Sequence, residues 1–196
     1  MTTARMAVQL GLVKFSPSGQ SFPGRSGGSP KSYVLDTRGA GSHLQLRELI
    51  LEELRKQART LPRFDVFGGI SKSGTIWGAW CALLENIPFA NILLDGARES
   101  GLQRDVEGDV VGRKVLLVDN WIHSGDSILK ATEVIQRAGA VPVAALSVAR
   151  HCTVSLPIPI ASAWTITELL DAARIEGLWN PAGLPTTAEA ANMEIT

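Results

Sequence analysis

The sequence has few cysteines and no excess of charge of either sign. Cys81 and Cys152 are its two cysteines, and neither belongs to a Cys-x-x-Cys pair. This spacing argues against a disulfide framework or a zinc site and fits a reducing compartment, so we expect the protein in the cytoplasm. The 19 basic and 19 acidic side chains cancel, which leaves no overall field to attract nucleic acid or an anionic membrane. Any site for a polyanion must therefore be local.

Long apolar runs are also missing. No apolar stretch reaches the roughly 20 residues that a membrane-spanning helix needs, so we expect no membrane partner. Apolar residues still make up 45% of the 196 residues, which suits a chain long enough for one sizeable core and short for two full domains. We therefore expect a single domain over residues 1–196, with residues 43–150 as its α/β core.

Strand and helix patterns alternate through the middle of the chain. Leucine and isoleucine recur with helical spacing after Ser42, an acceptable N-cap, and predict a helix to about Thr60. The other expected helices are Gly74–Asn86, Ile128–Gly139 with Gly139 as the stop, and Thr167–Ile175, and the expected strands are Phe64–Phe67, Phe89–Leu94, Lys114–Val118, Val141–Val148 and an edge strand at Ala161–Ile166. This alternation predicts right-handed crossovers and a mostly parallel sheet flanked by helices, in the α/β class.

The segment Val115–Ser127 (VLLVDNWIHSGDS), which joins the expected central strand to a helix, carries residues suited to a phosphate monoester. Ser124 and Ser127 offer hydroxyl groups, Gly125 allows close backbone approach, and consecutive N–H groups at a helix start form an anion nest. Asp119 can accept hydrogen bonds from ribose hydroxyls. We therefore predict a sugar-phosphate site here, although an apolar strand followed by an acidic turn and glycine is common in α/β proteins.

This segment resembles the sugar-phosphate motif of the type I phosphoribosyltransferases, which is a strand, two acidic residues, two apolar residues and a Thr-Thr-Gly-Gly-Thr/Ser run. Asn120 stands where the second acid is expected, His123 replaces a small hydroxyl residue, and Asp126 adds a negative charge beside the expected dianion. The resemblance implies that the sugar phosphate is bound by Asp119, Asn120, His123, Ser124, Gly125, Asp126 and Ser127.

A second segment, Gly69–Gly74, lies between an expected strand and an expected helix. It lacks the Gly-Lys-Ser/Thr of a P-loop and the Gly-x-Ser-x-Gly of a nucleophile elbow. The family has at this place a loop that binds pyrophosphate through backbone amides. The resemblance therefore assigns pyrophosphate to Ile70, Ser71, Lys72 and Ser73.

The N-terminal loop is similar to that of the orotate phosphoribosyltransferases. Its matching residues are Phe22, Arg25, Ser26, Gly27, Ser29, Tyr33, Asp36 and Arg38, with Arg25 in place of the family's lysine. The resemblance implies a small hood over the base, built from residues 1–42, with a C-terminal edge and tail in residues 151–196. Arg25 and Ser26 become candidate contacts to the base, whereas composition alone also allows Gly24–Ser32 to be a linker.

The resemblance implies a reaction in which ribose 5-phosphate moves from phosphoribosyl pyrophosphate to a nucleobase and pyrophosphate is released. Mg²⁺ is the implied cofactor, held mainly by substrate oxygens and water, so no protein residues are expected as metal ligands. A homodimer is implied because the family's mobile loop reaches across a dimer interface. Asp119 and Arg98 are the candidate catalytic residues, and Arg98 lies near the place of the family's catalytic lysine.

Two other interpretations stay open. The corresponding loop here, LLDGARESGLQRD, has no lysine, and an arginine can neutralise pyrophosphate but cannot donate a proton at neutral pH. With Asn120 and Asp126, this favours a regulatory domain that binds phosphoribosyl pyrophosphate or a nucleotide without turnover. An unrelated α/β protein that binds a nucleotide or sugar phosphate is the third interpretation.

Three tryptophans and two histidines are expected in structural positions and not in the site. We expect Trp77 and Trp80 in the core or on a dimer face, and Trp121 packed under the sugar-phosphate segment. His43 and His151 are expected at the surface or at a helix start.

Overall fold

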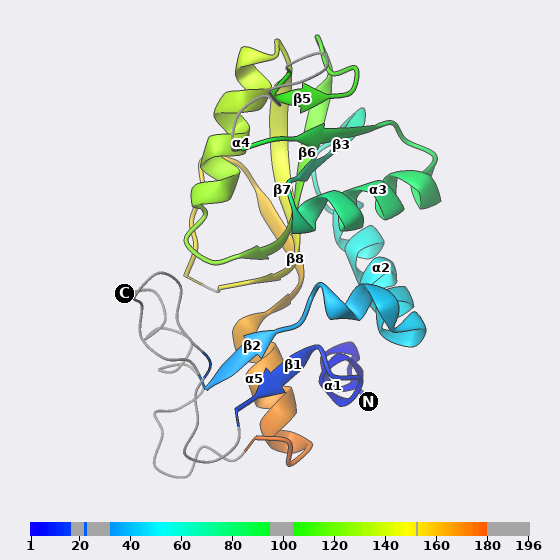
Figure 1. Ribbon diagram of the computed structural model, residues 1–196, viewed down its shortest axis with the longest axis vertical. Helices are drawn as coiled ribbons and strands as arrows, with labels where there is room; N and C mark the ends of the chain where they lie inside the picture. Colours follow the sequence, from blue (N-terminus) through cyan, green and yellow to red (C-terminus); the bar gives the residue numbers. More distant parts are fainter. Residues whose placement is uncertain (17–21, 23–31, 95–103, 152, 180–196) are drawn as a thin grey trace. The chain divides into compact units, whose positions relative to one another are not determined.

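The computed structural model describes residues 1–16, 22, 32–94, 104–151 and 153–179 (Figure 1). It divides into two compact units. The sheet unit comprises Leu51–Arg150 and Val154–Ala163, and the terminal unit comprises the described residues of Met1–Ile50, His151–Thr153 and the chain from Trp164 onward. Arg25, Ser26 and Arg98 lie outside the described residues.

The sheet has six strands in the order β5-β4-β3-β6-β7-β8. Their bounds are β3 Val66–Ile70, β4 Phe89–Ile92, β5 Val106–Glu107, β6 Lys114–Ile122, β7 Val141–Arg150 and β8 Ile160–Thr165. The strand β3 pairs in parallel with β4 and β6, and β6 pairs in parallel with β7. The short β5 is antiparallel to its neighbour β4. The mostly parallel sheet confirms the predicted α/β class.

The central strand β6 is longer than predicted. It continues to Ile122, so Asp119 and Trp121 lie in the strand and not in a loop after Val118. Asp119 pairs with Ser147 of β7, and Trp121 pairs with Ala149. The prediction was wrong because the polar Asp119 and Asn120 suggested a turn, whereas the long neighbour β7 supplies hydrogen-bond partners for this stretch of backbone.

The described residues between β4 and β6 include a strand that the sequence did not predict. The two residues of β5 form the edge of the sheet, and the side chains of Val106 and Val110 are buried. A strand of this length has no periodic sequence signal, so its existence depends on tertiary contacts.

Two helices cover opposite faces of the sheet, as Figure 1 shows: α3 (Ser73–Glu85) on one face and α4 (Asp126–Arg137) on the other. On α4, Ile128 and Ile135 pack into a buried apolar cluster with Val115 and Leu117 of β6. On α3, Trp77 is 1% exposed, which confirms the expectation that it belongs to the core. None of the helices in the described ranges is long and apolar enough to cross a membrane.

One of the two predicted helix ends is confirmed, and the other differs from the prediction. Gly139 has φ +76° after the last residues of α4, and the N–H of Ala140 donates to the carbonyl of Ile135 at 3.1 Å, which is the predicted glycine stop. The helix α2 (Leu44–Ala58) is capped by His43, whose Nδ1 accepts the N–H of Leu46 at 3.3 Å. Ser42, the predicted cap, lies instead in the preceding 3₁₀ turn η2 (Gly39–Ser42).

The terminal unit holds α1 (Thr3–Gln9), the antiparallel pair β1 (Val13–Phe15) and β2 (Tyr33–Leu35), and α5 (Ile166–Ile175). The ion pair between Arg5 and Glu176 joins α1 to the end of α5, and Thr165 and Glu168 form a capping box at the start of α5. His151 is 0% exposed and follows a strand, so the prediction that it lies at the surface or at a helix start was wrong. It follows β7 directly, and burial continues past the end of that strand.

Gly74 allows the start of α3 to lie directly on β6. A Cβ atom at this position would collide with the carbonyl oxygen of Val118 and lie 2.9 Å from the Cα of Asp119. Both are backbone atoms of a central strand, which cannot move aside as a flexible side chain could. The close approach therefore requires glycine.

We predict that Gly74→Ala lowers the free energy of unfolding by about 1–3 kcal/mol, the usual cost of forcing an extra carbon into a packed region. In an unhindered helix the same change would stabilise by up to about 1 kcal/mol through helix propensity. Urea denaturation of the two proteins measures the difference, with the exposed Gln136→Ala of α4 as a control for substitution on a helix. An increase in stability for Gly74→Ala would contradict the close approach.

Candidate functional site

Two predicted segments lie at the carboxyl ends of the parallel strands, which we call the carboxyl edge of the sheet. Since β3 and β6 are adjacent and parallel, with Gly69 opposite Val118, the segments that follow them leave from the same edge. One leads into α3 and the other into α4, and Gly74 brings the start of α3 against Asp119. The fold thus brings together the residues predicted for pyrophosphate, Ile70–Ser73, and those predicted for the sugar phosphate, Asp119–Ser127.

The pyrophosphate segment divides between strand and helix. Ile70 is the buried last residue of β3, and the N–H of Ser71 donates to the carbonyl of Ile92 at 2.9 Å, within the sheet. The Ser71–Lys72 peptide bond is cis. Lys72 is exposed and Ser73 is the first residue of α3, whose first turn carries amides without intrahelical acceptors. An anion here would therefore meet the helix start and the lysine, since the Ser71 amide already has a partner.

The sugar-phosphate segment has the geometry of a helix start entered through glycine. Gly125 is the N-cap of α4 with φ +93°, in the left-handed region that glycine adopts without strain. Ser124 is exposed and Ser127 is half-buried, while Asp119 is only 8% exposed and its Oδ1 accepts the N–H of Asn120 at 2.7 Å. Hydroxyls and first-turn amides therefore surround one end of α4, with a carboxylate at the adjoining strand end.

The acidic residue in this segment has a structural explanation. Asp126 is exposed and lies in the first turn of α4, where the helix dipole stabilises a negative charge. Its N–H lies 3.5 Å from the Oγ of Ser124. The helix dipole that stabilises the charge of Asp126 in the free protein would also stabilise an anionic ligand at the first turn of α4. The carboxylate of Asp126 would repel such a ligand.

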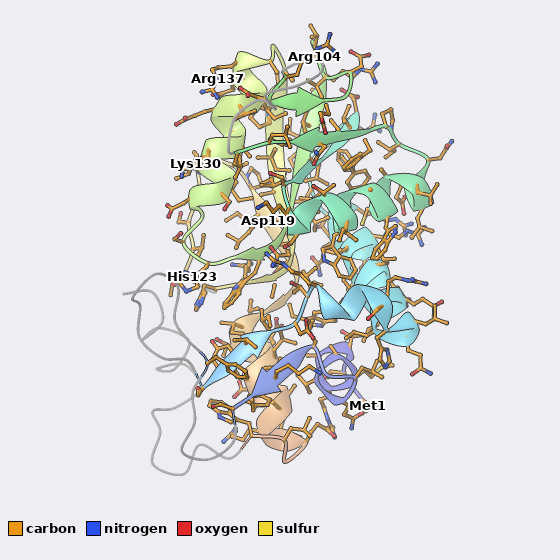
Figure 2. The ribbon with its side chains drawn as sticks, in the orientation of Figure 1. Met1, Arg104, Asp119, His123, Lys130 and Arg137 are labelled. Carbon is orange, nitrogen blue, oxygen red and sulfur yellow. The ribbon has the colours of Figure 1, made fainter. Side chains whose placement is uncertain are left out.

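Trp121 and His123 flank the site as a pair. Their ring centroids are 5.4 Å apart at 82°, an edge-to-face contact, and both side chains are half-buried. Figure 2 shows Asp119 near the start of α3 and His123 in the turn that leads to α4. Trp121 thus packs against His123 within the segment.

Arg150 and Leu156 belong to this region, and sequence reasoning gave neither a role. Arg150 is the last residue of β7 and pairs in register with Ile122, which places a cationic residue at the same edge of the sheet. Leu156 lies over Gly125, with its Cδ2 2.7 Å from where a Cβ of Gly125 would be. An arginine at the carboxyl end of a predicted parallel strand is a signal that could have identified the first; the second depends on tertiary packing.

The described part of the chain offers little support for a protein-held metal centre or for a cysteine nucleophile. It contains no group of three or more His, Cys, Asp or Glu side chains able to hold a metal ion. Burial, followed by the charge of Glu85, raises the pKa of the Cys81 thiol to about 12, so this cysteine stays protonated at neutral pH. It is a core residue of α3 and a poor nucleophile.

Known proteins similar to this chain are found among curated sequences and among solved structures. No family model matches the chain. Among curated proteins, the orotate phosphoribosyltransferase of Streptococcus agalactiae is 28% identical over 167 residues, covering 81% of this chain and 79% of that protein. The orotate phosphoribosyltransferase of Saccharolobus solfataricus is 30% identical over 150 residues, covering 74% of this chain and 75% of that protein.

Solved structures show the same fold. The orotate phosphoribosyltransferase from Aeropyrum pernix has a TM-score of 0.73 at 22% identity, over 91% of this chain and 100% of that chain. The Leishmania donovani UMP synthase has a TM-score of 0.77 at 18% identity, over 98% of this chain and 41% of that chain. The chain belongs to the type I phosphoribosyltransferase family, with orotate phosphoribosyltransferases among its relatives.

Proposed function

We propose that the protein transfers ribose 5-phosphate from phosphoribosyl pyrophosphate to a nucleobase, with orotate as the first candidate, and releases pyrophosphate. The observation that carries the proposal is that the starts of α3 and α4 both follow the carboxyl ends of adjacent parallel strands, with Asp119 beside the start of α3. Free first-turn amides suit both helix starts to an anion. The substrate has phosphate groups at both ends of a ribose, so it needs two such sites at a short separation. The names of the relatives support orotate as the base.

The 5′-phosphate would bind at the start of α4. The hydroxyls of Ser124 and Ser127 and the first-turn amides after Gly125 would donate to its oxygens, and His123 lies at the entrance of the same turn. The carboxylate of Asp119 would accept hydrogen bonds from the ribose hydroxyls, and the side-chain amide of Asn120 would accept from them or donate to them. This arrangement fixes the sugar relative to the sheet.

The pyrophosphate would bind at the start of α3. Lys72 and the first-turn amides after it supply positive charge and donors, and we assign Arg98 as a further cation. Oxygens of phosphoribosyl pyrophosphate and water would supply most ligands of Mg²⁺, because a small hard cation needs few protein groups when the substrate brings its own oxygens. Bound there, Mg²⁺ would neutralise the leaving group.

The reaction requires little covalent participation by the protein. A ring nitrogen of the base forms a bond to the anomeric carbon and gives up its proton to water. The bond from that carbon to the pyrophosphate oxygen breaks, and its electron pair leaves with pyrophosphate. Positive charge builds on the sugar, close to the carboxylate of Asp119. Catalysis then depends on alignment of the reactants and on charge placed in advance.

Groups that could hold an anionic base are Arg25 and Ser26, proposed from the sequence, and Arg150, which lies at the sheet edge. Orotate carries a carboxylate, which arginine binds in a bidentate manner. The two separated cysteines support our proposal that the protein acts in the cytoplasm, a reducing compartment.

A pyrophosphate-release assay with phosphoribosyl pyrophosphate, Mg²⁺ and a panel of bases tests the function. We expect release with orotate, and we expect Ser124→Ala/Ser127→Ala to weaken binding of phosphoribosyl pyrophosphate by at least about tenfold, because each lost hydrogen bond to a charged group costs about 1.5–3 kcal/mol. The exposed Ser155→Ala is a matched control that should leave binding unchanged. Binding without release for any base would support a regulatory domain, and no binding at millimolar ligand would refute the proposal.

The charge at Asp126 gives a second prediction. Replacing it by Asn keeps the shape of the side chain and removes one negative charge beside the expected phosphate, so affinity for ribose 5-phosphate should rise severalfold at low ionic strength. The gain should shrink as salt is added, because the position is exposed. Calorimetry at two salt concentrations measures both effects; an unchanged affinity at low salt would place the phosphate away from this carboxylate.

We also propose that the protein is a homodimer and that α3 contributes to the interface. Three aliphatic side chains on this helix are unusually exposed, namely Leu83 at 77%, Leu84 at 49% and Ile76 at 43%. Leu83 and Leu84 follow Ile76 by seven and eight residues, so the three lie on one side of the helix. Exposed apolar surface of this kind is typical of a protein interface.

Sedimentation velocity tests this face. We expect the wild-type protein to sediment as a dimer and Leu83→Asp to sediment as a monomer, since the buried charge would find no partner in an apolar interface. Val111→Asp is the control, because Val111 is similarly exposed at 74% but lies beside Gly139, which follows α4. A dimer that survives Leu83→Asp would exclude this helix as the interface.

A further inference from the structure

A series of hydrogen-bonded polar side chains links three elements of the sheet unit. The Oγ1 of Thr75, in the first turn of α3, donates to the Oδ1 of Asn91 in β4 at 2.6 Å. The Nδ2 of Asn91 donates to the Oε2 of Glu107 in β5 at 2.9 Å. Asn91 is half-buried and holds one partner on each side of its amide.

The chemistry of the partners fixes the direction of both hydrogen bonds. The carboxylate of Glu107 can only accept, so the amide nitrogen of Asn91 must face it. The amide oxygen then faces Thr75, whose hydroxyl must donate. Reversing the Asn91 amide would lose the bond to Glu107 and set an amide oxygen against a carboxylate, although the Thr75 hydroxyl could then accept from the amide nitrogen. Glu107 therefore fixes the orientation of Asn91, which acts as an oriented connector.

Close backbone packing holds the connected elements in place on either side. A Cβ at Gly69 would lie 2.7 Å from the Cα of Thr75, so the first turn of α3 sits directly on β3. A Cβ at Gly108, which has φ +149°, would lie 2.8 Å from the Cβ of Ala90, so the turn after β5 sits directly on β4. The hydrogen bonds of Asn91 therefore join two places where the backbone is already tightly packed.

The position of Thr75 gives these hydrogen bonds a functional consequence. Thr75 follows Ser73 by two residues, in the same first turn whose amides would bind pyrophosphate. We propose that Asn91 is a positioning residue for the pyrophosphate segment, acting through Thr75 and held in turn by Glu107. The inference rests on the proposed function, because it assumes that pyrophosphate binds at the start of α3.

Small displacements of this turn should matter for binding. Donors aimed at an anion work only when they are held in the productive geometry, and a misplacement of about 1 Å can cost about 10²-fold in rate. The start of α4 lies on the opposite face of the sheet and contains none of these three side chains. Loss of the Asn91 hydrogen bonds should therefore weaken pyrophosphate binding and leave ribose 5-phosphate binding intact.

Exchanging the amide at position 91 with the carboxylate at position 107 tests the proposal. Asn91→Asp places one carboxylate against that of Glu107 and breaks the bond. Asn91→Asp/Glu107→Gln restores it, because the glutamine amide can donate to the carboxylate introduced at position 91, and Thr75 can still donate in this double variant. We expect affinity for pyrophosphate with Mg²⁺ to fall about tenfold in the single variant and to recover in the double variant, with affinity for ribose 5-phosphate within about twofold throughout.

Thr75→Val is the second variant, in case the paired carboxylates of Asn91→Asp prevent folding. It keeps the branched shape and removes the donor, and it should reproduce the selective loss of pyrophosphate affinity. Equal loss of both affinities, no loss, or no recovery in the double variant would overturn the inference while the wild-type protein still binds both ligands. A wild-type protein that binds neither ligand would instead refute the proposed function, and the inference with it.

Discussion

The structure depends on the contact between the start of α3 and the backbone of β6 at Gly74. This contact has no room for a side chain, and it sets the distance between the two segments that leave the carboxyl edge of the sheet. One segment ends in the first turn of α3 and the other contains Asp119 and leads into α4. The substrate that we propose carries phosphate groups at both ends of a ribose and would need such a fixed separation, so a packing constraint in the core would become a constraint on the ligand.

Basic and acidic side chains both lie at the carboxyl edge of the sheet. The chain as a whole carries equal numbers of basic and acidic side chains, so attraction for the polyanionic substrate that we propose would come from the helix starts, Lys72 and Arg150, with Arg25 and Arg98 as further proposed cations. Asp126 opposes that attraction at α4 while stabilising the helix itself. We propose that Asn91 positions the start of α3 through its hydrogen bonds to Thr75 and Glu107. Its side chain is uncharged, so it adds no charge to the site.

The sequence predicted the features that depend on local pattern. Consecutive apolar residues indicated the central strands, and the small polar run around Gly125 indicated the turn into α4. It did not predict that β6 continues through Asp119 to Ile122, because that extension depends on pairing with β7. For the same reason the edge strand β5, the burial of His151 and the packing of Leu156 on Gly125 could not be read from the chain: each depends on residues distant in sequence.

The most direct test of the central claim is a crystal structure of the protein with ribose 5-phosphate and pyrophosphate bound. We expect the 5′-phosphate at the first turn of α4 beside Ser124 and Ser127, the ribose hydroxyls toward Asp119, and pyrophosphate at the first turn of α3. Both ligands would then lie at the same edge of the sheet. Phosphate groups bound elsewhere, or a ribose turned away from Asp119, would contradict it.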